Sequence, residues 1–228
     1  MDAESLLICW EHGRRRHALD RGLLLFAAAA PDVNPETLAD RTLGERNAAL
    51  LRLRQKLFGD ELKCCVECSE CGEKLEFSLN ASTLLKRADA KTSGPAQVEV
   101  AGKRVRLPTS RDLACIAAEQ DEASATLKLL QRLSGSEEAL AAADEISRAL
   151  DEADPCMDFA IEFTCPECAH AWGASFDVPA YLWEEIDARA RRLLDEIHVL
   201  ARTYNWGERQ ILQLSETRRR AYLERVLA

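Results

Sequence analysis

Apolar residues recur at helical spacing in two long stretches of the chain. Leu50, Leu53 and Leu57 share one face of a helix expected over 47–58, which follows a capping-box pattern beginning at Thr42 and ends before a glycine. A longer helix is expected after Val178–Pro179, because its apolar positions repeat every 3 to 4 residues. These positions are Tyr181, Leu182, Ile186, Ala190, Leu193, Ile197 and Leu200.

Shorter segments between these helices predict strands. Residues 97–100 and 104–107 alternate between polar and apolar around 101–103, which is typical of a β-hairpin, and 159–163 forms a short apolar strand. Three further helices are expected at 112–119, 122–133 and 136–150. The pattern as a whole predicts a mostly helical α+β protein with a small antiparallel β module.

Composition and charge narrow the function classes. The chain has 228 residues, is 47% hydrophobic and carries a net charge of −9. That acidic balance argues against broad nucleic-acid binding through the phosphate backbone, which needs a basic surface. The longest apolar run, Leu23–Ala30, is far shorter than the ~20 residues that cross a bilayer. We therefore expect neither a nucleic-acid partner nor a membrane.

The N-terminal region imitates a secretion signal. Arg14–Arg16 and Arg21 precede the apolar run Leu23–Ala30, but Glu11 and Asp20 interrupt the basic stretch. The interpretation that fits both observations is a buried helix with a small alanine face. The expected location is the bacterial cytoplasm, either free or incorporated in a larger particle.

The cysteines carry the clearest chemical signal. Four of the nine cysteines lie in two similar short motifs, Cys68-Ser-Glu-Cys71-Gly and Cys165-Pro-Glu-Cys168-Ala, each followed by a segment that favours a strand. Two C-x2-C turns supply four soft ligands at tetrahedral corners, which suits Zn²⁺. The sequence therefore predicts a structural zinc ribbon with Cys68, Cys71, Cys165 and Cys168 as ligands. Four thiolates fill the coordination sphere, so no catalytic position is expected.

Alternatives to this ligand set stay open. Cys65 and Cys68 also form a C-x2-C pair, Cys64 lies beside them, and His170 follows the second motif closely enough to compete as a ligand. Incidental buried thiols and a redox C-x-x-C pair are the other interpretations of these motifs. The long interval between the motifs implies an inserted subdomain, since a simple ribbon has only ~15–20 residues there.

This reasoning divides the chain into three parts. Residues 1–59 form an N-terminal helical region, residues 60–178 a zinc ribbon with an inserted subdomain at 81–155, and residues 179–228 a C-terminal helical docking segment.

The C-terminal segment carries a recognisable signature. The stretch 197–223 predicts a helix, a break near Asn205–Gly207, a short helix, a Ser215 cap and a final helix. It resembles the C-terminal signature of the T-even-type phage baseplate hub assembly chaperone family, whose relatives occur in contractile injection systems. The matching positions are His198, Leu200, Ala201, Tyr204, Trp206, Glu208, Ile211, Leu212, Leu214, Arg218, Arg219, Tyr222 and Leu223. The cysteine motifs are a departure from shorter members of that family.

The resemblance implies a non-enzymatic chaperone or structural subunit whose partners are baseplate hub or wedge proteins. The residues expected to bind those partners are Tyr204, Trp206, Arg218, Arg219 and Tyr222. Read without the family, the aromatic residues suit either a core anchor or an interface, and the arginines suit a solvated face or pairing with acidic groups. No nucleotide-binding, hydrolase or metalloprotease motif occurs, so neither catalytic residues nor a small-molecule substrate are expected. The alternative is a zinc-ribbon module for protein interaction or for regulation alongside nucleic acid.

Overall fold

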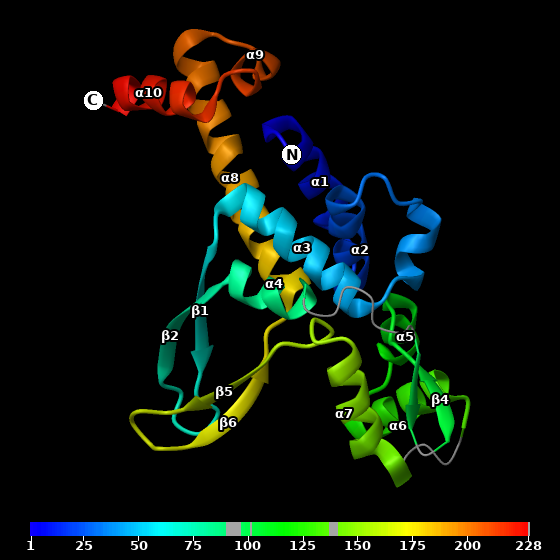
Figure 1. The fold of residues 1–228 in the computed structure, drawn as a ribbon. Coiled ribbons are helices and arrows are strands. Elements are labelled where there is room, and N and C mark those ends of the chain that lie inside the picture. The colour runs from blue at the N-terminus through cyan, green and yellow to red at the C-terminus, as the bar shows by residue number, and fades with distance from the viewer. Residues whose placement is uncertain (90–96, 101, 137–140, 228) are drawn as a thin grey trace.

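The fold was analysed in a computed structural model that describes residues 1–89, 97–100, 102–136 and 141–227. The N-terminal helices pack along a long diagonal helix, α8 (Val178–Tyr204), with two β-hairpins near one end of it and a small helical lobe at the other (Figure 1). The N-terminal part contains α1 (Ala3–Gly13), α2 (Ala18–Ala29), a 3-10 helix (Pro35–Asp40) and α3 (Leu43–Phe58).

The main core lies between the N-terminal helices and α8 (Val178–Tyr204). Thr42 caps α3 by accepting a hydrogen bond from the Glu45 amide, as the sequence pattern predicts, and Gly59 ends the helix with a φ of +91°. Leu50 and Leu51 of α3 and Leu25 of α2 have no exposed surface. The leader-like apolar run therefore forms part of a packed core helix.

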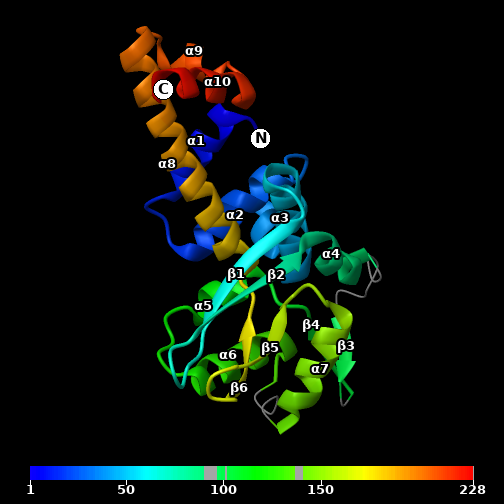
Figure 2. The same cartoon turned by 90° about the vertical axis from the view of Figure 1, so that its left-hand side faces the viewer.

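Two antiparallel hairpins extend from this core (Figures 1 and 2). The first pairs β1 (Glu61–Glu67) with β2 (Lys74–Asn80), and α4 (Ala81–Asp89) follows it. The second pairs β5 (Ala160–Thr164) with β6 (Ala171–Ser175). Each hairpin is a separate two-stranded sheet among the described residues. Isolated two-stranded sheets are marginal in water, so side-chain contacts must hold this region together.

The bases of both hairpins are anchored in the core. Leu62 at the start of β1 is fully buried, and Phe159 just before β5 is 1% exposed. Arg54 of α3 forms a two-pronged ion pair with Glu185 of α8, with Nη2–Oε1 at 2.7 Å. Beside that pair the Tyr181 hydroxyl of α8 donates to the Lys63 carbonyl at 3.1 Å. Helices α3 and α8 thus fix where the hairpins start.

The segment between the hairpins builds a second apolar cluster. It contains β3 (Gln97–Val100), β4 (Lys103–Arg106), α5 (Ser110–Ile116), α6 (Glu122–Ser134) and α7 (Ala143–Ala153). Val105, Leu130 and Leu150 are buried within it. The predicted hairpin and the first two predicted helices are present here, whereas the helix expected at 136–150 begins only at Ala143 and extends to Ala153. Position 101 of the hairpin and positions 137–140 of that predicted helix lie outside the described residues.

The C-terminal lobe follows the predicted order. Helix α8 ends at Asn205, whose φ is +58°, and α9 (Glu208–Leu212) and α10 (Glu216–Leu227) fold back beside it. Ser215 caps α10 through a hydrogen bond from the Arg218 amide. Figure 1 shows this lobe at the end of α8 opposite the hairpins.

The predicted fold class is confirmed: the protein is mostly helical α+β, with antiparallel hairpins and a long C-terminal helix. Among the described helices, none combines the length and the apolar character needed to cross a membrane. The division at residues 59 and 178 stays a prediction, since two apolar clusters do not by themselves define units that fold independently.

Candidate metal centre

The two cysteine motifs form matching knuckles at the tips of the hairpins. In the first, the Cys68 amide donates to the Glu73 carbonyl at 2.8 Å and the Gly72 amide donates to the Cys68 carbonyl at 3.0 Å. The second repeats both bonds, from Cys165 to His170 at 2.8 Å and from Ala169 back to Cys165 at 2.9 Å. The residue after the second cysteine is left-handed in both knuckles, with φ +75° at Gly72 and +58° at Ala169. The sequence repeat is therefore also a structural repeat.

The knuckles bring four sulfur atoms from distant parts of the chain together. The ligand atoms of Cys68, Cys71, Cys165 and Cys168 all lie within 4.8 Å of one another. Across the two hairpins, Cys68 Sγ is 3.7 Å from Cys168 Sγ, and Cys71 Sγ is 3.5 Å from Cys165 Sγ. Cys68 and Cys165 are buried, whereas Cys71 and Cys168 are exposed. Each knuckle thus contributes one inner and one outer sulfur.

These separations fit a metal site and do not fit disulfides. A disulfide needs a sulfur separation of ~2.0 Å, so the two cross-hairpin pairs are not bonded. Four sulfurs each ~2.3 Å from one tetrahedral ion are ~3.8 Å apart, close to the two measured separations. The four-cysteine group is therefore consistent with a closed metal site.

The charge state of the sulfurs depends on the knuckle amides. Hydrogen bonds from the Cys71 amide, then from the Glu70 amide and the Cys168 thiol, outweigh desolvation and lower the pKa of Cys68 to about 7. The Glu73 amide lowers the pKa of Cys71, but hydrogen bonds with the other three cysteines and desolvation raise it overall, to about 12. In Cys168 the His170 amide likewise lowers the pKa, and desolvation with the Cys165 and Cys68 contacts raises it overall. Of these three thiols, Cys68 therefore ionises most readily.

An aromatic row supports the centre from the strands. Phe77 of β2 meets Phe163 of β5 edge to face at 5.0 Å between ring centroids, and Phe163 stacks on Trp172 at 5.4 Å. The His170 ring also stacks on Trp172, with ring centroids 5.7 Å apart, and its Nε2 lies 3.2 Å from Ser69 Oγ of the first knuckle. The Phe77–Phe163 and Ser69–His170 contacts cross between the hairpins, so they hold the knuckles near each other.

The open alternatives for the ligand set are placed elsewhere. Cys64 Sγ lies 3.7 Å from the Leu62 carbonyl within β1, and Cys65 is exposed on the opposite face of that strand. The His170 ring contacts Ser69 and Trp172 as described above. None of these three belongs to the group of converging ligand atoms found among the described residues.

Sequence reasoning missed the contacts that cross between the hairpins. Ser69, Phe77 and Phe163 carry no motif, and the 86 positions from Phe77 to Phe163 gave no signal that the two rings meet. Alternation within each strand places these aromatic residues on one face. Only the knuckle geometry turns the two faces toward each other.

The residues predicted to bind a partner gather in the C-terminal lobe. Tyr204, Trp206 and Tyr222 form a half-buried aromatic cluster, with ring centroids 4.7 to 5.5 Å apart. Arg218 is exposed. Arg219 is only 3% exposed, and it donates to Glu196 at 3.0 Å and to the Leu214 carbonyl at 2.7 Å. The aromatic cluster thus packs against the main core and stays partly exposed, Arg218 is exposed, and Arg219 holds α10 onto α8.

Comparisons with models of known protein families, with curated proteins and with solved structures found no match.

Proposed function

We propose that this protein is a zinc-stabilised, non-enzymatic assembly or structural subunit of the baseplate hub of a contractile phage tail or injection system. The observation that carries the zinc-stabilised part of the proposal is the convergence of four cysteine sulfurs from two hairpins. The C-terminal signature adds the assembly role. Its aromatic members meet in one accessible cluster at the far end of α8 from the metal centre.

Zinc is the metal that suits this donor set best. Thiolates are soft ligands, and a tetrahedral four-sulfur group is typical of Zn²⁺ or of iron–sulfur chemistry. One ion at the centre of four sulfurs spaced ~3.8 Å apart matches a single Zn²⁺. Its charge would stabilise all four sulfurs as thiolates. A filled coordination sphere leaves no position for water or substrate, so the ion has a structural role.

The C-terminal lobe is the proposed docking element. Tyr204, Trp206 and Tyr222 each keep part of their ring surface accessible, and large aromatic residues dominate the energetics of protein interfaces. Arg218 adds an exposed cation at the start of α10. Helix α8 spans ~40 Å at 1.5 Å per residue, so a partner on this lobe would not contact the metal centre.

Metal analysis tests the first half of the proposal. The purified protein is expected to contain one zinc ion per chain, and Cys71→Ser is expected to lose it. Cys65→Ser is the matched control, since Cys65 is an exposed cysteine of the same hairpin outside the sulfur group. Equal zinc content in both variants would contradict the assignment. A bound iron–sulfur cluster, visible by its absorption, would contradict zinc as the metal.

Partner capture tests the second half. The protein is co-expressed with candidate baseplate hub and wedge proteins, and complexes are isolated by affinity purification. Arg218→Glu is expected to reduce hub or wedge recovery, whereas Arg148→Glu, an equally exposed arginine of α7, is expected to leave it unchanged. Trp206→Ala serves as a second variant, with a thermal melt to check folding. Recovery that is insensitive to both substitutions would refute docking through this lobe. Capture of regulatory or nucleic-acid-bound proteins instead would favour the alternative zinc-ribbon module.

A further inference from the structure

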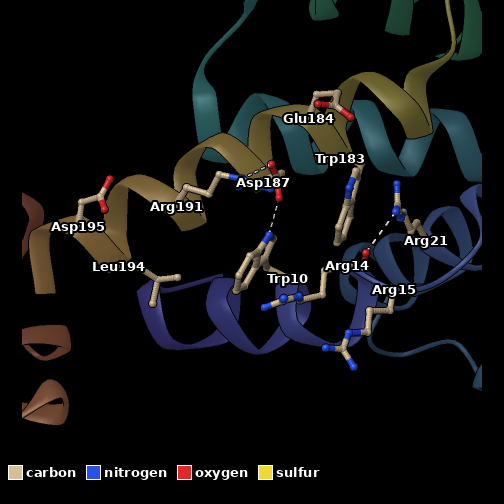
Figure 3. Close-up of a pocket in the computed structure, with 10 residues that line it drawn as sticks. All are labelled: Trp10, Arg14, Arg15, Arg21, Trp183, Glu184, Asp187, Arg191, Leu194 and Asp195. Atoms are coloured by element: carbon tan, nitrogen blue, oxygen red, sulfur yellow. Dashed lines mark hydrogen bonds and ion pairs between the residues drawn. The ribbon is translucent and has the colours of Figure 1, made fainter. Parts of the chain in front are cut away.

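A groove of about 860 Å³ runs between α1, the turn after it and α8 (Figure 3). Its lining residues belong neither to the cysteine knuckles nor to the aromatic cluster of the C-terminal lobe. Its lining includes Trp10, Arg14, Arg15, Arg21, Trp183 and Asp187. The predicted metal and docking roles use none of these residues.

The floor of the groove is rigid. Trp10 and Trp183 are 7% and 4% exposed, and the Trp10 indole donates to Asp187 of α8 at 2.6 Å. Gly13 ends α1 directly against Trp183, where a β-carbon would come within 2.3 Å of the indole ring. A glycine is therefore required for this close approach.

The turn that carries the arginines is braced from below. Arg21 of α2 donates to the carbonyls of Gly13 and Arg14 at 3.2 and 3.4 Å, and its guanidinium lies 4.9 Å from the Trp183 ring centroid. The Arg14 guanidinium lies over Trp10 at 5.0 Å from the ring centroid. These contacts fix the backbone from which Arg14, Arg15 and Arg16 project, so little conformational freedom is lost when the arginines bind a ligand.

The lining of the groove holds four arginines and three carboxylates, so one arginine is in excess. Asp187 is already shared by the Trp10 indole and by Arg191, which donates to it at 2.7 Å. The other two carboxylates of the lining, Glu184 and Asp195, lie on the side of α8 turned away from Arg14 and Arg15 in Figure 3. Within the part of the chain that the structure describes, neither Arg14 nor Arg15 forms an ion pair with a carboxylate.

We propose that this groove, referred to here as the α1–α8 groove, binds an acidic segment of a partner protein. Arg14 and Arg15 would pair with its carboxylates, and Leu194, 38% exposed at the other end of the lining, would contact an apolar residue of the same segment. Because the chain carries a net charge of −9, most of its surface repels an acidic partner, and the arginines of this turn attract it. An acidic segment is therefore directed to this groove. The proposal is independent of the metal and of docking through the C-terminal lobe.

Peptide binding tests the proposal. The probe is a short fluorescein-labelled peptide of glutamate and leucine at helical spacing, and its binding to the full-length protein is followed by fluorescence anisotropy. Arg14→Ala/Arg15→Ala is expected to weaken binding about tenfold, because two charge-assisted pairs are lost. Arg104→Ala/Arg148→Ala is the matched control: it removes the same charge from exposed positions of the inserted segment and is expected to leave the affinity unchanged.

Three results would overturn the proposal. The first is equal loss in the two double variants, which would mean that total charge alone governs binding. The second is tight binding of a peptide in which lysine replaces glutamate. The third is that a single-stranded oligonucleotide, or vesicles containing phosphatidylglycerol, bind more tightly than the acidic peptide and lose that binding in Arg14→Ala/Arg15→Ala. This result would assign the groove to a different class of partner. Thermal melts of both variants check that folding is retained.

Discussion

Removing the metal should release the hairpin tips and leave the helical core folded. Apart from the sulfurs, the contacts named above that cross between the hairpins are the Phe77–Phe163 ring pair and the Ser69–His170 hydrogen bond. Together these contribute ~2 kcal/mol. By mass action, free zinc at about 1,000 times its Kd adds ~4 kcal/mol to the free energy of opening the tips. In the proposed zinc-bound form, the ion would therefore supply most of the coupling between the hairpins.

Opening should stop at the hairpin bases. Leu62 and Ala81 are fully buried and Phe159 is 1% exposed, so the ends of the hairpins near the core belong to the main apolar cluster. Helices α3 and α8 also remain joined by the Arg54–Glu185 ion pair. Loss of the metal is thus a local event and not a global one.

Hydrogen exchange with and without a chelator measures this effect. Amides near the knuckles, at 65–76 and 162–173, are expected to exchange about 1,000-fold faster after chelation, which corresponds to the ~4 kcal/mol above. Amides of α3 and α8 are expected to keep their protection. Cys71→Ser should reproduce the fast exchange without chelator, and Cys65→Ser should not. Unchanged exchange at the knuckles, or an equal loss of protection throughout α3 and α8, would refute the reasoning.

Three further substitutions or conditions test the packing around this module. Ala169→Gly should stabilise the second knuckle by up to ~1 kcal/mol in chemical denaturation. A left-handed φ costs a residue with a β-carbon ~1–2 kcal/mol, and glycine removes that cost but makes the unfolded chain more flexible, which offsets part of the gain. Gly44→Ala should lower the free energy of unfolding by ~2–4 kcal/mol, because the new β-carbon would lie 1.6 Å from the Asp154 carboxylate, which accepts a hydrogen bond from the Gly44 amide. An unchanged free energy of unfolding would show that the end of α7 is not fixed at this point. Acidification below about pH 4 should destabilise the inserted segment through Asp112. Desolvation raises the pKa of Asp112, but hydrogen bonds from Arg106 and Thr109 outweigh it and hold the pKa well below 3.8. The stability that the ionised carboxylate provides above its unfolded pKa is therefore lost as the pH falls through its folded pKa. An Asp112→Asn protein whose thermal melt has the same acid dependence would contradict that assignment.

Much of the local structure could be read from the sequence. The Thr42 cap, the breaks at Gly59 and Asn205, and the apolar spacing through Leu182, Ile186 and Leu193 are short-range features, because capping and helical periodicity involve neighbours within one or two turns. The metal-site residues were predictable for a related reason. Each C-x2-C knuckle is a local turn, and the repeat of two knuckles implies that they share one ion.

The three-dimensional structure decided which surfaces meet. Arg219, one of three consecutive arginines with similar sequence context, is buried against Glu196, whereas Arg218 remains exposed. The α1–α8 groove likewise arises only because Gly13 lets Trp183 pack against the end of α1. Local spacing determined the helices, the hairpins and the four sulfur ligands of this protein. The burial of individual charges and the pairing of distant faces depend on contacts beyond one or two helical turns, from 23 residues for Arg219 and Glu196 to 170 for Gly13 and Trp183, and those were settled by packing.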